Sequence, residues 1–227
     1  MRLKDILTPS FRTFRHPSQP VVVVETDSDF CTEVVAQGIM THEQMEQAAS
    51  TYRLGKSRSG KCIFWLIDRQ DIVRDGHIGQ WWVTQMLRQR HPNLARYIVA
   101  RHCLFGLHLL GSHSTADIAR RQPVAIVDSE PSAVILSVLY PTLTWMASGP
   151  CPTIDMMEPL IGHRVTLFPR TDPLQEYYTA ALLLSQQAKQ AYGLDISVSD
   201  ILERHATPEQ KARKIDIADL LELRIEN

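Results

Sequence analysis

The sequence predicts an α/β protein: a parallel sheet flanked by helices, preceded by a smaller α+β lobe. From residue 123 onward, apolar strand-like runs alternate with helix-like segments, which is typical of a parallel sheet covered on both faces. Before that point, two helical segments precede a pair of strands joined by a polar turn. A chain of 227 residues is long enough to bury cores of this kind.

We expect three parts along the chain. Residues 1–27 form an N-terminal arm that contains several prolines and basic residues. This arm packs on another surface or stays loose, and a short strand is expected near its end, at 21–24. Residues 28–122 form the smaller lobe, and residues 123–227 form the parallel-sheet domain with a helical C-terminal tail.

The smaller lobe begins with two helices that have recognisable ends. Ser28 or Asp29 caps the first helix and Gly38 stops it. Thr41 and Gln44 have the spacing of a capping box at the start of the second helix. The elements expected in this lobe are helices over 28–38 and 41–55 and strands over 61–68 and 72–83. The Arg-rich residues 84–103 have no clear assignment.

The sheet domain alternates regularly between the two kinds of element. Prolines fall at several of its turns. The expected order is strand 124–127, helix 131–140, strand 143–147, helix 154–161, strand 164–168 and helix 174–192, followed by a helical tail over 198–224.

Composition excludes several classes of protein. The net charge is −1, so nucleic acid would have to bind through a local basic patch. The cysteines are too far apart for a structural zinc site, and as unpaired thiols they indicate a reducing cytoplasm: Cys31, Cys62, Cys103 and Cys151. No signal peptide is expected, and no apolar run approaches the roughly 20 residues that span a bilayer.

Charged residues follow two of the predicted strands. The strand at 124–127 is followed by Asp128 and Glu130, and the strand at 164–168 by Arg170 and Asp172. Ligands of open α/β sheets bind at the carboxyl ends of strands, and clustered carboxylates suit Mg²⁺. The alternative is that these residues cap the helices that follow.

Basic residues concentrate in the segment RLGKSRSGK, at 53–61, where a Gly- and Ser-containing loop is expected. Lys56, Arg58 and Lys61 in this loop, with Arg101 from a second cluster, could contact the phosphates of single-stranded nucleic acid. The alternative is an ordinary solvated loop between a helix and a strand.

Three segments of the sheet domain carry motifs in a characteristic order: VAIVDSEPSAVIL, LTWMASGPCPT and VTLFPRTD. They resemble a Toprim domain, the catalytic fold of bacterial primases and topoisomerases. Upstream, VVAQGIMTHEQMEQAASTYRLG and CLFGLHLL are similar to parts of the primase catalytic core, and KIDIADLLE is similar to the segment after its Toprim strands. The resemblance covers residues 28–227 and is closest to uncharacterised primase-like proteins of mobile elements.

The resemblance implies a Toprim-like sheet, a primase-core-like first lobe, and a partner in single-stranded DNA or RNA. In an active Toprim enzyme, Mg²⁺ bridges the acids to phosphate oxygens, so Asp128, Glu130 and Asp172 are the implied catalytic and metal-binding residues. An active Mg²⁺-dependent nucleotidyl or phosphoryl transferase or nuclease is therefore one possible function, and a non-catalytic structural partner protein is another.

Two departures from the family favour a third possibility, a nucleic-acid-associated protein with a degenerate metal site. The zinc-binding module is absent, so a protein partner would have to supply it. Asp128 stands where the family has Glu, and Arg170 stands at the first Asp of an Asp-x-Asp motif. A guanidinium repels Mg²⁺ at close range. We therefore expect Arg170 to replace the metal by pairing with Glu130 or Asp172.

Overall fold

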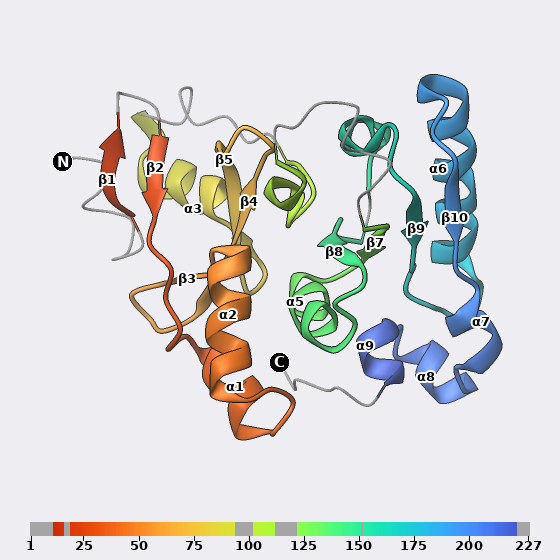
Figure 1. Cartoon of the computed structure of the whole chain (residues 1–227), viewed down its shortest axis with the longest axis horizontal. Coiled ribbons are helices and arrows are strands. Elements are labelled where there is room, and N and C mark those ends of the chain that lie inside the picture. Colours follow the sequence, from red (N-terminus) through yellow and green to blue (C-terminus); the bar gives the residue numbers. More distant parts are fainter. Residues whose placement is uncertain (1–10, 16–18, 94–101, 112–121, 151, 222–227) are drawn as a thin grey trace. The chain divides into compact units, whose positions relative to one another are not determined.

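The computed structural model describes residues 11–15, 19–93, 102–111, 122–150 and 152–221 (Figure 1). The chain divides into two compact units, Met1–Gly111 and Ser112–Asn227, whereas the sequence analysis placed the boundary after residue 122. Both units contain helices and strands, so the predicted α/β class is confirmed. None of the described helices is long and apolar enough to cross a bilayer.

The first unit contains an antiparallel hairpin and a four-stranded antiparallel sheet. The hairpin consists of β1 (Phe11–Arg15) and β2 (Gln19–Val22), of which β1 was not expected. The sheet consists of β3 (Gly55–Lys56), β4 (Cys62–Ile67), β5 (Val73–Ile78) and β6 (Trp81–Trp82), in that order. The helical segments are α1 (Asp29–Ala36), α2 (His42–Tyr52), α3 (Val83–Arg90) and the 3-10 turn η3 (Leu107–Leu110).

The predicted helix starts in this unit are confirmed. The Ser28 hydroxyl accepts a hydrogen bond from the Cys31 N–H at the start of α1. Thr41 and Gln44 form both hydrogen bonds of a capping box at the start of α2. These bonds satisfy N–H groups that have no partner inside a helix, so local sequence was sufficient to place the two starts.

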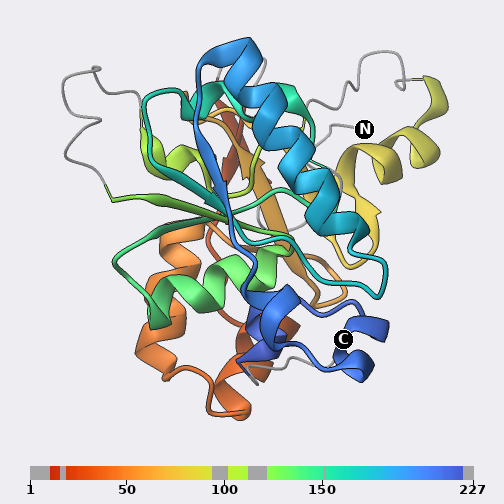
Figure 2. The ribbon, with the colours of Figure 1, turned by 90° about the vertical axis from the view of Figure 1, so that its right-hand side faces the viewer.

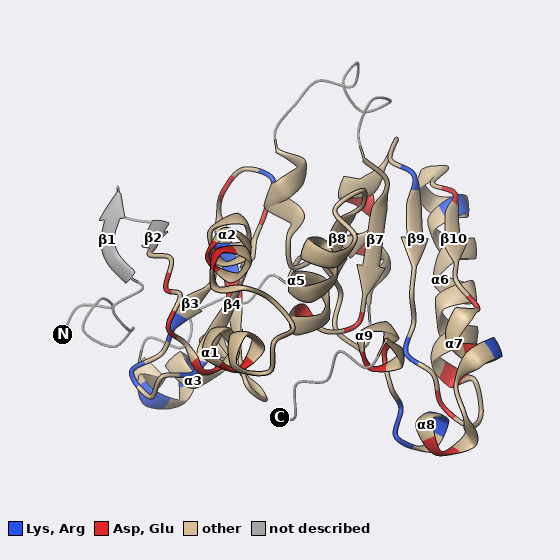
Figure 3. Ribbon diagram, turned by 60° about the horizontal axis from the view of Figure 1, so that its bottom comes forward, with Lys and Arg blue, Asp and Glu red and all other residues tan. Residues whose placement is uncertain are grey.

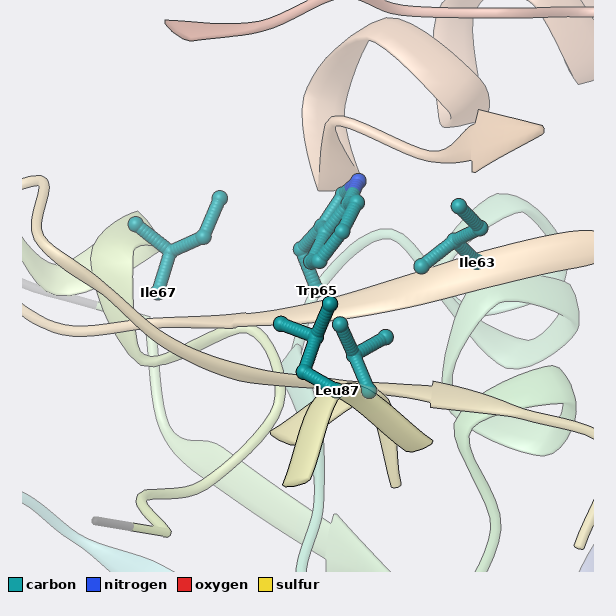
Figure 4. Packing of buried hydrophobic residues seen from close by; sticks show 5 residues of the cluster. Ile63, Trp65, Ile67 and Leu87 are labelled. Atoms are coloured by element: carbon teal, nitrogen blue, oxygen red, sulfur yellow. The ribbon is translucent and has the colours of Figure 1, made fainter. Parts of the chain in front are cut away.

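Strand β4 supplies the centre of the first unit's core, since all six of its residues are buried. Trp65 lies opposite Gly76 of β5, and its indole ring covers that glycine so closely that a Cβ atom there would lie 2.6 Å from the ring. Four further buried residues complete this cluster (Figure 4): Ile63, Ile67, Val83 and Leu87.

The second unit is built on a four-stranded sheet in which all neighbouring strands are parallel. Its order is β10-β9-β7-β8, with β7 (Val124–Val127), β8 (Thr144–Ala147), β9 (Val165–Leu167) and β10 (Ile196–Val198). Helices α5 (Glu130–Leu139) and α6 (Glu176–Tyr192) flank the sheet on opposite faces (Figure 2). The predicted parallel sheet covered by helices is therefore confirmed.

One expectation for the second unit was wrong. The segment 154–161 forms two 3-10 turns, η4 (Ile154–Met156) and η5 (Glu158–Leu160), because Pro159 has no N–H to continue a helix and restricts the residue before it. The C-terminal region is helical as expected, but it is divided into short pieces and follows a strand that was not expected. It begins with strand β10 and continues as three short helices, α7 (Ile201–His205), α8 (Pro208–Ala212) and α9 (Ile217–Leu220).

Candidate functional site

The order of strands in the second unit creates a switch point between β7 and β9. The chain runs from β7 to β8 on one side and then returns to β9 on the other side of β7. Ligands of open α/β sheets bind outside the carboxyl ends of strands at such a point. Asp128 follows β7 directly, and Arg170 and Asp172 follow β9. The predicted adjacency of the two strands that precede these acids is confirmed.

Arg170 forms an ion pair with Asp128 at this switch point. Its Nε donates a hydrogen bond to the carboxylate oxygen Oδ2, and its Nη2 lies within ion-pair distance of the same oxygen. Asp128 is buried, whereas 28% of the Arg170 side chain is exposed. The ion pair observed for Arg170 is with Asp128, whereas the sequence analysis expected Glu130 or Asp172; the guanidinium does lie against one of the three predicted acids.

The ionisation of Asp128 is set by opposing effects. Burial raises the pKa of its carboxyl group to about 6, although Arg170 acts to lower it. Asp216 and Glu130 raise it further through their charges. The carboxylates that influence Asp128 are thus Asp216 and Glu130, and Asp172 is not among them.

Asp216 organises this edge of the sheet, although the sequence analysis did not name it as a site residue. Its Oδ2 accepts hydrogen bonds from the hydroxyls of Ser129, at 2.9 Å, and Ser132. Its Oδ1 accepts the N–H groups of Ala218 and Asp219, which caps α9. Ser129 in turn caps α5. A single carboxylate therefore joins the start of α5 to the start of α9.

Asp172 accepts hydrogen bonds from backbone N–H groups before and within the first turn of α6, whose N-cap residue is Gln175. Its carboxylate accepts the N–H groups of Leu174, at 2.9 Å, and Tyr177, at 3.1 Å. Burial alone would raise the pKa of Asp172, but the backbone hydrogen bonds from Tyr177, Glu176 and Leu174 together outweigh it and hold the pKa below its usual value. The Asp172 carboxylate is therefore engaged by the backbone at the start of α6.

Two of the three predicted Mg²⁺ ligands, Asp128 and Asp172, are engaged by other groups. Within the described ranges, no group of three or more His, Cys, Asp or Glu side chains is placed to hold a metal ion. Arg170 lies on Asp128, and Asp172 faces backbone N–H groups at the start of α6. Mg²⁺ requires several oxygen ligands in near-octahedral geometry, and these two acids are already engaged by other donors.

Arg170 is also held on its other side. Its Cζ lies 5.4 Å from the centre of the Tyr177 ring, and Lys214 Nζ lies 5.6 Å from the same ring. The next residue, Thr171, is fully buried; its N–H donates to Ile215 O and its hydroxyl donates to Glu203. These contacts anchor the loop that carries the guanidinium.

In the first unit, the predicted basic loop is a tight hairpin between β3 and β4. The Ser57 N–H donates to Lys61 O at 2.8 Å, and the Gly60 N–H donates to Ser57 O at 3.0 Å. Arg58 and Lys61 are exposed, and Lys56 forms an ion pair with Asp27. Across both units, acidic and basic residues are interspersed along the ribbon (Figure 3). Arg101 lies outside the described residues.

Comparison with known proteins gives a family without an assigned activity. No curated protein matches the chain. Residues 28–171 match the model of a family described as "Domain of unknown function (DUF6371)". This match includes the basic hairpin, Asp128 and Arg170, but it ends before Asp172 and Asp216. Because it spans more than half of the 227 residues, the chain belongs to the DUF6371 family.

Proposed function

We propose that this protein is a primase-like, nucleic-acid-associated protein whose Toprim-like metal site is degenerate. On this proposal it binds single-stranded DNA or RNA through the basic hairpin of the first unit. A separate protein would supply the zinc-binding module that primases carry. The sheet at 124–198 would have kept the Toprim-like arrangement without its magnesium chemistry.

The observation that carries the proposal is the ion pair between Arg170 and Asp128 at the switch point of the sheet. In a Toprim enzyme a divalent cation would neutralise the acids at this edge. Here the Arg170 guanidinium supplies positive charge to Asp128, the acid that follows β7. An arginine side chain stays charged at any pH of interest. Mg²⁺ would have to displace this guanidinium or bind beside it against its repulsion.

The nucleic-acid part of the proposal is supported by the hairpin between β3 and β4. Lys56, Arg58 and Lys61 lie within six residues on a short, hydrogen-bonded turn. A turn held by its own backbone loses little freedom on binding, so its side chains can contact phosphates at low entropic cost. Such contacts release counterions, and affinity should therefore fall steeply as salt rises.

The binding experiment uses fluorescence anisotropy with labelled single-stranded DNA and RNA over a series of salt concentrations. The variant Lys56→Gln/Arg58→Gln/Lys61→Gln should bind at least tenfold more weakly than the native protein and show a shallower salt dependence. The control Lys189→Gln/Arg204→Gln/Arg213→Gln removes the same charge from the second unit and should bind like the native protein. Absence of binding by native protein at low salt would favour a purely structural partner protein.

The metal part is tested separately by calorimetry. Native protein should bind Mg²⁺ weakly, with a dissociation constant above the millimolar range. Arg170→Asp, which restores an acid at that position, should bind it measurably more tightly. Tight binding by native protein, or Mg²⁺-dependent nucleotidyl transfer or nuclease turnover, would instead establish the active enzyme as the better description.

A further inference from the structure

Two cysteines lie side by side in the first unit, although they are 31 residues apart in the sequence. Cys31 is in the first turn of α1, and Cys62 is the first residue of β4. Each thiol acts on the ionisation of the other: Cys62 lowers the pKa of Cys31, and Cys31 raises the pKa of Cys62. The Ser28 side chain lowers the pKa of both thiols, which is consistent with their lying together at the start of α1.

The backbone around the two cysteines holds them in this arrangement. The Asp29 N–H donates to Gly60 O at 2.9 Å, and the Cys62 N–H donates to Asp29 Oδ1 at 2.7 Å. These bonds join the first turn of α1 directly to the start of β4. Cys31 is 1% exposed and Cys62 is 4% exposed, so the pair is enclosed by the core of the unit.

We propose that Cys31 and Cys62 are a redox-active thiol pair that closes to an intramolecular disulfide on reaction with a small-molecule disulfide such as oxidised glutathione. The disulfide would tie α1 to β4 next to the basic hairpin. This proposal does not depend on nucleic-acid binding, because it concerns only the state of the two thiols.

The reaction is an ordinary thiol–disulfide exchange. Cys31 loses its proton to water, and its thiolate attacks one sulfur of oxidised glutathione, which forms a mixed disulfide and releases one glutathione thiolate. That thiolate takes the proton of Cys62, and the Cys62 sulfur then attacks the Cys31 sulfur and releases the second glutathione as a thiolate, which water protonates. The two protein thiols lose two electrons, and the glutathione disulfide gains them.

The two thiols differ in a way that suits these two steps. The Cys62 thiol lowers the pKa of Cys31 and outweighs the opposite effect of burial. Burial raises the pKa of Cys62 well above its usual value. Cys31 is therefore the thiol that ionises first and attacks. Burial also raises the pKa of Cys103 to about 12, so that thiol should not compete.

Because the pair is buried, reaction requires a transient opening of the short helix α1. Exchange should therefore be slow in the native protein and faster in concentrations of urea well below the unfolding transition. Once formed, the disulfide closes a loop of about 30 residues and reduces the freedom of the unfolded chain. The oxidised protein should melt several degrees higher than the reduced protein, and dithiothreitol should reverse the change.

The experiment uses the full chain with Cys103→Ser and Cys151→Ser, which leaves only the pair. After incubation with oxidised glutathione, the protein is denatured and treated with N-ethylmaleimide. We expect a monomer that has lost two hydrogen atoms in mass and takes up no maleimide. Further variants with Cys31→Ser or Cys62→Ser should show no rise in melting temperature on oxidation.

Three results would overturn the proposal: two maleimide adducts after prolonged oxidation, a glutathione adduct that persists on Cys31, or a disulfide-linked dimer. If the double serine variant does not fold, the same oxidation is applied to native protein and followed by peptide mapping. A peptide linking Cys31 to Cys62 supports the proposal, and links that involve Cys103 or Cys151 instead contradict it.

Discussion

Arg170 forms an ion pair with Asp128 and donates a hydrogen bond from its Nε to Asp128 Oδ2, across the junction between neighbouring strands β9 and β7. The pair lies at the switch point of the sheet, where an α/β protein would usually hold a ligand. Asp128 is buried near two other acids, so without the guanidinium its ionised form would be costly. The arrangement links the stability of the second unit to the charge of one carboxyl group.

Replacing Arg170 by Met should therefore destabilise the protein in a pH-dependent way. The pKa of Asp128 is already raised to about 6, and loss of the guanidinium would raise it further. A carboxyl group whose pKa is higher in the folded protein than in the unfolded chain stabilises the fold most at low pH, and this contribution is lost as the pH rises through the folded pKa. In urea unfolding, Arg170→Met should lower the unfolding free energy by on the order of 3 kcal/mol at pH 8 and by much less at pH 5.

The control for this prediction is the double variant Arg170→Met/Asp128→Asn. It removes both charges, so the difference between pH 5 and pH 8 that is specific to Arg170→Met should disappear. An equal loss at both pH values in Arg170→Met would mean that Asp128 does not carry the effect, and that the contact between Arg170 and Tyr177 matters more.

Asp216 and Asp172 should differ in their importance for stability. Asp216→Ala removes four hydrogen bonds, uncaps α9 and leaves the buried Ser132 hydroxyl without its acceptor. We therefore expect the unfolding free energy to fall by roughly 2 to 4 kcal/mol. Asp172→Ala removes two hydrogen bonds to backbone N–H groups at the start of α6 and should lower the unfolding free energy by about 1 kcal/mol. Urea unfolding of both variants at pH 7 gives the comparison. A larger loss for Asp172→Ala would reverse this ranking of the two acids.

The contrast between these acids shows what local sequence could predict. Strands β7, β8 and β9 were found because continuous apolar runs are typical of buried parallel strands, and helix starts were found because caps act over three or four residues. Strand β10 has three residues and only the first is buried, so it has no periodic signal.

The site depended on contacts that no local pattern records. Asp216 accepts a hydrogen bond from Ser132, 84 residues earlier in the chain, and only the fold brings the two together. Its D-x-x-D spacing before an apolar segment was nevertheless a capping signal that could have been read from the sequence. Arg170 is two residues from Asp172, but that acid is occupied by the start of α6, so the guanidinium pairs across the strands with Asp128.

His108 should make the first unit sensitive to mild acid. Burial lowers the pKa of its imidazole, its Nε2 lies 3.0 Å from the Thr51 carbonyl oxygen, and its buried Nδ1 has no hydrogen-bond partner within the described residues. The His108 imidazole therefore takes up a proton less readily in the folded protein than in the unfolded chain. The stability that the neutral imidazole contributes is present above its ordinary pKa of 6.5 and is lost as the pH falls below that value. His108→Gln, which keeps an N–H donor without the titration, should show a smaller fall in unfolding free energy between pH 7 and pH 5.5 than native protein. An unchanged pH dependence would show that His108 is not responsible.

Gly76 should be intolerant of even one added methyl group. A Cβ atom at this position would lie 2.6 Å and 2.7 Å from two carbons of the Trp65 ring and 3.1 Å from Val83, so the indole would have to move within a packed core. Gly76→Ala should therefore destabilise the protein by roughly 1 to 3 kcal/mol, measured by urea unfolding.

Trp65→Leu alone should also be destabilising, because it leaves a cavity opposite Gly76. In the double variant the alanine methyl occupies part of the space that the indole vacates, so the combined loss should be smaller than the sum of the single losses by on the order of 1 kcal/mol. Strict additivity in this double-mutant cycle would mean that the contact between Trp65 and Gly76 is not what limits residue 76 to glycine.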